Sequence, residues 1–272
     1  MISIVHSPVN LGILSVTHEF EFYLLEPPMP LSDILTQASN FFKNNISQLA
    51  FLFVPILFVQ VGIQLWLSLE ISSADLENPQ FGTSHMVAMM VLLLVFSFLI
   101  AALTLFLEIR SQGHSPSNGM ILKTSFNFVP ALLLAGVFSG LAVLAPVFIL
   151  MAVNPMLGII GLVASVYLFA RLAFVNFMVV VERLTPLEAI KRSFSFSGPI
   201  AFKTMAIFLL YIPLSLFGGV LAQLTELGGI PLKLIGDVVV AFFGLFVNVA
   251  LFRLYMVSRP TPASPGNIES EE

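Results

Sequence analysis

Five polar side chains lie within or at the ends of long apolar stretches of this chain. Glu108 ends the second stretch, Arg171 interrupts the fourth, and Arg253 lies near the end of the sixth. A guanidinium in hydrocarbon costs between about 2.5 and 17 kcal/mol unless it is paired or hydrated. We therefore expect Arg171 to pair with a carboxylate, for which Glu108 is the best placed, or to bind an anion such as a lipid phosphate, and we favour the structural pair. Asn176 and Asn248 are expected to complete this intramembrane polar cluster.

The composition indicates a membrane protein. Of the 272 residues, 58% are hydrophobic and 10% are charged, and the mean hydropathy is +1.00, which lies outside the range of soluble domains. A spanning helix needs about 20 apolar residues. Such runs occupy residues 49–69, 86–107, 129–152, 156–179, 201–223 and 234–257. The sequence therefore predicts an all-α polytopic membrane bundle of about six transmembrane helices.

The third and fourth runs belong to one uncharged stretch from Thr124 to Ala170. We divide this stretch at Asn154-Pro155, because the residue before a proline resists the helical conformation and a helical hairpin needs a turn. Without this division the number of spans is five.

Basic residues are concentrated on one side of the predicted bundle. With the N-terminus inside, Lys233 falls outside, Arg171 falls within a span, and the other nine fall in cytoplasmic segments: Lys43, Arg110, Lys123, Arg183, Lys191, Arg192, Lys203, Arg253 and Arg259. The first outer loop, residues 70–85, is acidic and has no basic residue. Because basic residues near span ends are retained in the cytoplasm, both termini are predicted to be cytoplasmic. The net charge of −4 thus conceals a basic inner face that suits anionic lipid headgroups and does not indicate nucleic acid.

An amphipathic helix is predicted between the fourth and fifth spans. Thr185 and Glu188 match a capping box, and Pro186 occupies the favoured first helical position. The apolar face consists of Leu187, Ile190 and Phe194, and the charged face includes Lys191 and Arg192. Such a helix beside a span is expected to lie flat in the inner headgroup layer.

Two other segments repeat this arrangement. Residues 117–128 align with it before the third span. Residues 32–49 precede the first span, where Ser32 can cap a helix whose stripe is Ile34, Leu35, Ala38, Phe41, Phe42 and Leu49. Each segment leads into a span with a proline (Pro55, Pro146 or Pro213) followed by a return span without an interior proline. The chain is therefore predicted to consist of three helix-hairpin repeats, each preceded by an amphipathic interfacial helix. The candidate lipid-headgroup contacts are Lys123, Lys191, Arg192 and Lys203.

Reactive residue types form no catalytic or metal-binding pattern. The chain has no cysteine, which excludes disulfides, thiol catalysis and cysteine-ligated metals. His6 and His18 lie in the N-terminal segment, and His85 and His114 are expected on opposite faces of the membrane, so no zinc site or general base can assemble from the two loop histidines. No phosphate loop, dinucleotide fingerprint or nucleophile elbow is present. The sequence predicts no enzymatic activity and no cofactor.

Two further patterns favour structural roles. Gly136 and Gly140 are spaced as a small-residue packing face, at which helices approach closely. Lys233 and Asp237 lie four residues apart and are expected to form a local pair at the outer end of the sixth span.

The two ends of the chain differ from the span-rich part. Residues 1–28 carry no Lys or Arg and no continuous apolar core, so they are predicted to be a poorly ordered, dispensable extension, with Met29 as an alternative start. Residues 29–257 form a single transmembrane domain. Residues 258–272 are rich in Pro and Ser and end acidic, which is typical of a disordered tail.

Three stretches together resemble the YciC family of bacterial inner-membrane proteins: "ASNFFKNN" (38–45), "ERLTPLEAIKRSFSF" (182–196) and "LFRLYMVSR" (251–259). The resemblance runs from about residue 29 to residue 259. It implies an inner-membrane location and several spans, but it supplies no catalytic residues and no mechanism. "EAIKRSF" is also similar to an element of membrane domains that precede some glycerophosphodiester phosphodiesterase domains, an activity not carried over because no such domain follows here.

Two functions remain from the sequence. The favoured one is a non-enzymatic multi-pass inner-membrane protein that acts on lipids or membrane-protein partners through its basic inner collar and supports envelope organisation. The alternative is a small transporter or channel with a polar site around Arg171.

Overall fold

The computed structural model describes residues 29–73, 82–226 and 228–259, and within these residues the chain forms helices joined by short connections, without a strand. Six segments are long and apolar enough to cross a membrane: Leu31–Ile71, Thr83–Ser111, Asn118–Val153, Pro155–Val181, Ala201–Thr225 and Gly229–Ser258. These segments contain the six predicted apolar runs. The predictions for residues 1–28 and 260–272 lie outside the described residues.

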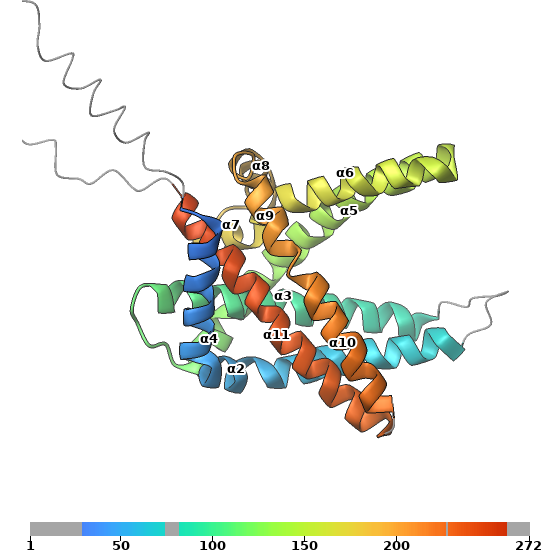
Figure 1. The fold of residues 1–272 in the computed structure, drawn as a ribbon, viewed down its shortest axis with the longest axis horizontal. Coiled ribbons are helices and arrows are strands. Elements are labelled where there is room, and N and C mark those ends of the chain that lie inside the picture. The colour runs from blue at the N-terminus through green and yellow to red at the C-terminus, as the bar shows by residue number, and fades with distance from the viewer. Residues whose placement is uncertain (1–28, 74–81, 227, 260–272) are drawn as a thin grey trace, which may run out of the picture.

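Helix α2 (Leu31–Ser73) joins the first amphipathic segment and the first span in one continuous helix. Its two parts point in different directions (Figure 1). The helix also contains Pro55, which has no backbone N–H to donate to a helical hydrogen bond. The predicted stripe is partly or fully buried, and Ile34, Ala38, Phe42 and Leu49 belong to the core. The prediction that Ser32 caps the helix is wrong, since the helix begins one residue earlier, at Leu31.

The next elements are α3 (Thr83–Ser111), α4 (Asn118–Ser125), the 3₁₀ turn η1 (Phe126–Phe128) and α5 (Val129–Val153). Helix α3 packs against α2, and most of its second half, Ser97–Leu107, is buried. Helix α4 is capped by Ser117, whose hydroxyl accepts a hydrogen bond from the Met120 amide at 3.3 Å. The segment expected to form the second amphipathic helix is therefore helical, with η1 linking it to the third span.

The predicted division of the long uncharged stretch is confirmed. Asn154 is extended and ends α5, and its side-chain oxygen accepts from the Met156 amide at 2.9 Å. The 3₁₀ turn η2 (Pro155–Leu157) then leads into α6 (Gly158–Arg171). The Asn154 side chain and Pro155 thus form the turn between the two spans without any charged residue.

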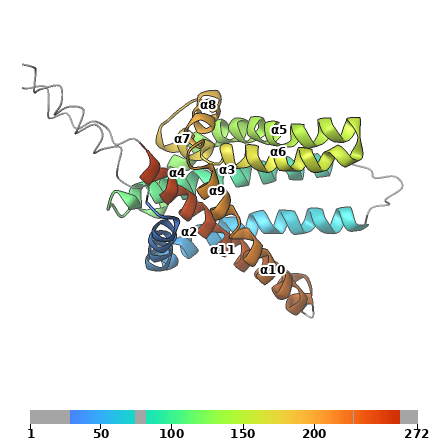
Figure 2. The same ribbon diagram turned by 45° about the horizontal axis from the view of Figure 1, so that its top comes forward.

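Helices α5 and α6 run side by side (Figure 2), and their backbones are close at Gly161. A Cβ atom there would lie only 2.7 Å from the carbonyl oxygen of Pro146. The predicted packing face at Gly136 and Gly140 is wrong, because a Cβ at either position would have nothing within 4 Å. Both glycines line a cavity instead.

Helix α6 ends at Arg171, and the chain continues through α7 (Val175–Val181) and α8 (Pro186–Phe196). The predicted capping box is present, since the amide and hydroxyl of Thr185 lie 3.1 and 2.7 Å from the carboxylate of Glu188, to which they donate. Helix α8 packs on the bundle through small buried residues, Ala189 and Ser193 on the helix and Ser197 directly after it. The residues expected to form its apolar face do not share one environment. Leu187 and Phe194 are exposed, whereas Ile190 is partly buried against the core.

The last elements are α9 (Ala201–Phe208), α10 (Tyr211–Glu226) and α11 (Gly229–Ser258). Leu209 and Leu210 interrupt the fifth span shortly before Pro213, which cannot donate a helical hydrogen bond. Helix α11 packs along both α10 and α2, so the first and last described helices share one of the main contacts of the fold.

Both ends of the described chain lie at the same end of the molecule (Figure 1). There the Nζ of Lys203 donates to the carbonyl of Met29 at 2.8 Å, and the Nε of Arg253 donates to the side chain of Gln37 at 2.5 Å. We call this end, which also carries α4, α7 and α8, the terminal end. The opposite end, with the α5–α6 and α10–α11 connections, is the turn end. The predicted Lys233–Asp237 pair is confirmed at the turn end, with 3.5 Å between Nζ and Oδ2.

Candidate functional site

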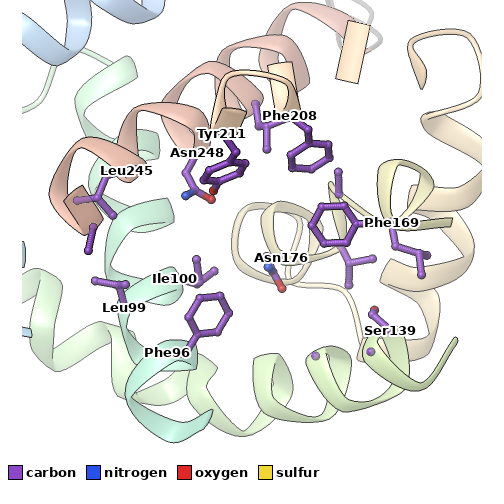
Figure 3. Close-up of a pocket in the computed structure, with 18 of the residues that line it drawn as sticks. Phe96, Leu99, Ile100, Ser139, Phe169, Asn176, Phe208, Tyr211, Leu245 and Asn248 are labelled. Carbon is purple, nitrogen blue, oxygen red and sulfur yellow. The ribbon is translucent and has the colours of Figure 1, made fainter. Parts of the chain in front are cut away.

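A cavity of about 630 Å³ lies between the helices and receives residues from all six candidate spans. Most of its wall is apolar, and polar side chains come from several helices: Gln60, Ser139, Asn176, Tyr211, Ser215 and Asn248. Figure 3 shows Asn176 directed into the cavity, with Asn248 beside Tyr211 on another wall. We call this space the central cavity. Its size falls within the range of about 300–1,000 Å³ typical of small-molecule sites.

Several of these polar groups have no hydrogen-bond partner within the described part of the chain. The Oε1 atom of Gln60 and the Oγ atom of Ser139 are buried and unpaired. By contrast, the hydroxyls of Ser125 and Thr204 donate to backbone carbonyls one helical turn earlier, at 2.7 and 3.0 Å. Buried polar groups are normally satisfied, so the unpaired atoms mark a place where a further molecule can bind.

The structure divides the predicted polar cluster. Asn176 and Asn248 both line the central cavity, whereas Glu108, Arg171 and Arg253 do not. Within the described residues, Arg171 belongs to no ion pair. The five residues therefore do not form one site.

Arg171 lies at the end of α6 and is held by α8. Its guanidinium donates to the hydroxyl of Tyr167 at 2.9 Å and to the backbone carbonyl of Phe194, and it lies 4.2 Å from the centroid of the Phe194 ring. Its own carbonyl accepts the hydroxyls of Ser193 and Ser197 at 2.9 and 2.8 Å. Carbonyl, hydroxyl and aromatic contacts thus replace the expected carboxylate.

Glu108 and Arg253 have other neighbours. Arg183 and Arg259 are the cations that act on the Glu108 carboxylate, and Arg183 lines the same small pocket of about 200 Å³. Arg253 lines a different pocket, of about 180 Å³, together with Gln37, which accepts its hydrogen bond. Each charge is therefore accommodated at a separate place.

A polar network centred on Glu182 was not predicted. The carboxylate is only 9% exposed; it accepts the hydroxyl of Tyr255 at 2.5 Å and pairs with Arg192 at 2.9 Å and Arg259 at 3.8 Å. These residues join the end of α7 to α8 and the end of α11. The sequence offers one indication of this network, which is a single carboxylate directly after an apolar run and beside Arg183.

The four predicted headgroup contacts have different surroundings. Lys123 and Lys191 are exposed. The side chain of Arg192 is 57% exposed although it pairs with Glu182. Lys203 is partly buried, and its ammonium donates to the carbonyl of Met29.

Within residues 29–73, 82–226 and 228–259, no group of three or more His, Asp or Glu side chains could hold a metal ion.

No family model, curated protein or solved structure matches this chain. The resemblance to the YciC family stays a prediction from the sequence.

Proposed function

We propose that this multi-pass protein is a non-enzymatic component of the bacterial inner membrane, with both termini in the cytoplasm, that organises anionic lipids around a basic collar. The collar consists of α4, η1 and α8, which lie at the terminal end. It acts on lipid headgroups and also offers a surface to membrane-protein partners. The resemblance to the YciC family and the distribution of basic residues support this placement.

The proposal rests on one observation: exposed apolar and basic side chains alternate on the collar helices. On α4 and η1, Met120 is 52% and Phe126 64% exposed, and Lys123 is exposed between them. On α8, Leu187 is 58% exposed and Lys191 follows one turn later, also exposed. An apolar side chain in the acyl region beside an ammonium at headgroup level is the arrangement of interfacial helices.

The arrangement of spans is consistent with three repeated units. Consecutive spans contact each other as α2 with α3, α5 with α6, and α10 with α11, and a short or amphipathic helical segment precedes the first span of each pair. In this proposal the duplicated hairpins form the stable frame, and the collar supplies the contact with lipid.

The test is the selectivity of the reconstituted protein for phosphatidylglycerol over phosphatidylcholine, measured with spin-labelled lipids. A basic residue near an anionic surface contributes about 1 kcal/mol, so Lys123→Gln combined with Lys191→Gln should remove most of the selectivity, and added salt should weaken what remains. Lys233→Gln, at the turn end, is the matched control and should leave selectivity unchanged. An unchanged preference in the double variant would refute the collar.

The second candidate is a small transporter or channel, and the polar groups of the central cavity favour it. Arg171 does not line that cavity, so the polar site would be centred on Asn176 and Asn248. Because the chain has no cysteine, a single Ser139→Cys variant can report on water. Reaction with a membrane-impermeant maleimide from both sides of a vesicle would support transport over lipid organisation.

A further inference from the structure

We propose that the central cavity is a binding site for an uncharged lipid that carries a hydroxyl head, of the fatty alcohol or acylglycerol class, which enters sideways from the bilayer. This inference goes beyond the collar and does not depend on it. The collar would act on charged headgroups at the membrane surface, whereas the cavity takes a neutral molecule between the spans.

The chemistry of the wall requires a neutral ligand. Among the described residues that line the cavity there is no Arg, Lys, Asp, Glu or His. A buried ionised group without a counter-charge is very costly, whereas a neutral polar group is stable where it finds hydrogen-bond partners. Phosphate or carboxylate heads therefore fit poorly, and apolar chains with one or two neutral polar groups fit well.

The unpaired atoms select a hydroxyl from among the neutral heads. Oε1 of Gln60 is an acceptor that needs a donor, and the hydroxyl of Ser139 can donate or accept. The amide of Asn176, directed into the same space (Figure 3), offers both as well. A ketone or simple ester has only acceptors and would leave Gln60 unsatisfied, whereas a hydroxyl satisfies both kinds of group.

The rim of the cavity indicates how such a molecule reaches it. Phe96, Leu144 and Phe169 line the cavity yet are 45%, 50% and 51% exposed. They belong to three different candidate spans, where the outer surface faces hydrocarbon. An opening bordered by lipid-facing apolar side chains admits an acyl chain directly and presents no polar path to water.

The glycines of α5 leave room for the ligand. Gly136 and Gly140 line the cavity, and neither would bring a Cβ within 4 Å of another residue's atoms. Helix packing thus does not require glycine at these positions. A larger side chain at Gly140 would extend into free volume and compete with the ligand.

The experiment uses the full chain in lipid nanodiscs and a diazirine-bearing fatty alcohol as the photoactivatable probe. Labelling should map to peptides that carry cavity residues, and unlabelled fatty alcohol should compete for it much better than the ionised fatty acid or the methyl ketone of the same chain length. Gly140→Leu should lower labelling several-fold. Gly219→Leu is the matched control, because that glycine also lies in a span with nothing within 4 Å but outside the cavity lining, and it should label like the parent.

A second variant keeps the test decisive if Gly140→Leu does not fold. Asn176→Leu removes one polar partner and should weaken labelling by up to about tenfold, the effect of one hydrogen bond, whereas Asn44→Leu on the exposed surface of α2 should not. Labelling spread evenly over lipid-facing surfaces, or equal in the parent and cavity variants, would overturn the site. Equal competition by the fatty acid or the ketone would overturn the hydroxyl-lipid assignment. Loss of anionic-lipid selectivity in the lysine variants would leave these results unchanged, so the two proposals fail independently.

Discussion

The terminal end and the turn end of the bundle are held together in different ways. At the terminal end, the rings of Phe174, Phe177 and Phe196 surround Tyr255, with centroids 5.6 to 6.1 Å from it, and the Tyr255 hydroxyl donates to Glu182. At the turn end, an ion pair joins Lys233 to Asp237, and both side chains are more than a third exposed.

This difference follows from the solvent. Two apolar helices gain little from leaving lipid for each other, since lipid tails are as apolar as leucine. Stability then depends on tight packing, aromatic contacts and polar groups that find partners. These contacts gather where the spans meet the terminal surface, and the helices toward the turn end remain free to enclose a cavity. The following four predictions test this division, from the largest expected effect to the smallest.

Glu182→Gln should destabilise the protein most, by about 2–3 kcal/mol, because it removes a nearly buried charge that holds three helices. The measurement is unfolding in bicelles with increasing sodium dodecyl sulfate. Asp237→Asn is the matched control at the turn end, where an exposed pair should contribute no more than about 0.5 kcal/mol. Comparable losses in the two variants would remove the distinction between the two ends.

Gly161→Ala should destabilise by about 1–3 kcal/mol, because the added methyl group meets the backbone of α5 at 2.7 Å. Gly136→Ala adds the same group facing the cavity and should be neutral or stabilise by up to about 1 kcal/mol, since alanine favours helix. Unfolding of both variants under the same conditions checks the opposite signs. A loss at Gly136 as large as that at Gly161 would mean that α5 is packed on its cavity face.

Arg171 should couple to Tyr167 and not to Glu108. In double-mutant cycles, Arg171→Leu with Tyr167→Phe should show about 0.5–1.5 kcal/mol of coupling, the value of one hydrogen bond. The cycle with Glu108→Gln should be additive within about 0.5 kcal/mol. Strong coupling to Glu108 would restore the pair expected from the sequence.

Acid should loosen the start of α8. Hydrogen bonds from Thr185 hold the pKa of Glu188 below its usual value. A carboxylate with a lowered pKa stabilises the fold above its ordinary pKa, and this contribution is lost as the pH falls through the lowered value. A spin label at Leu187→Cys should therefore gain mobility only in acid. Thr185→Val should make the label mobile at neutral pH and remove most of the pH dependence, and a label that responds equally in both proteins would show that the cap is not the cause.

Features that depend on neighbouring residues could be predicted from the sequence. Asn154 and Pro155 turn the chain by their own conformational preferences, and the Thr185–Glu188 cap spans only one helical turn. Six apolar runs likewise predict six spans, because length and hydropathy alone decide them.

Features that depend on which helix faces which could not be predicted. Glu182 and Tyr255 are 73 residues apart, and nothing local in the sequence relates them. Depth along a straight span favours Glu108 as the partner of Arg171, but α6 ends at that residue and the guanidinium donates to the carbonyl of Phe194 on α8. The open face at Gly136 could not be predicted either. The spacing of small residues shows that they lie on the same side of a helix, but it does not show which element packs against that side.

The contact between α2 and α11 has a consequence for how the protein is made. The stripe of α2, including Ile34 and Phe42, is synthesised about two hundred residues before α11, whose Phe242 and Phe246 pack on Phe42 at ring distances of 5.6 and 5.9 Å. During synthesis the side of this surface that α11 covers lacks that partner until α11 leaves the ribosome, and contacts so distant in sequence form late. The insertion machinery or the lipid interface must therefore shelter the first helix throughout translation, and a chain that stalls before α11 presents an open flank to the quality-control proteases of the membrane.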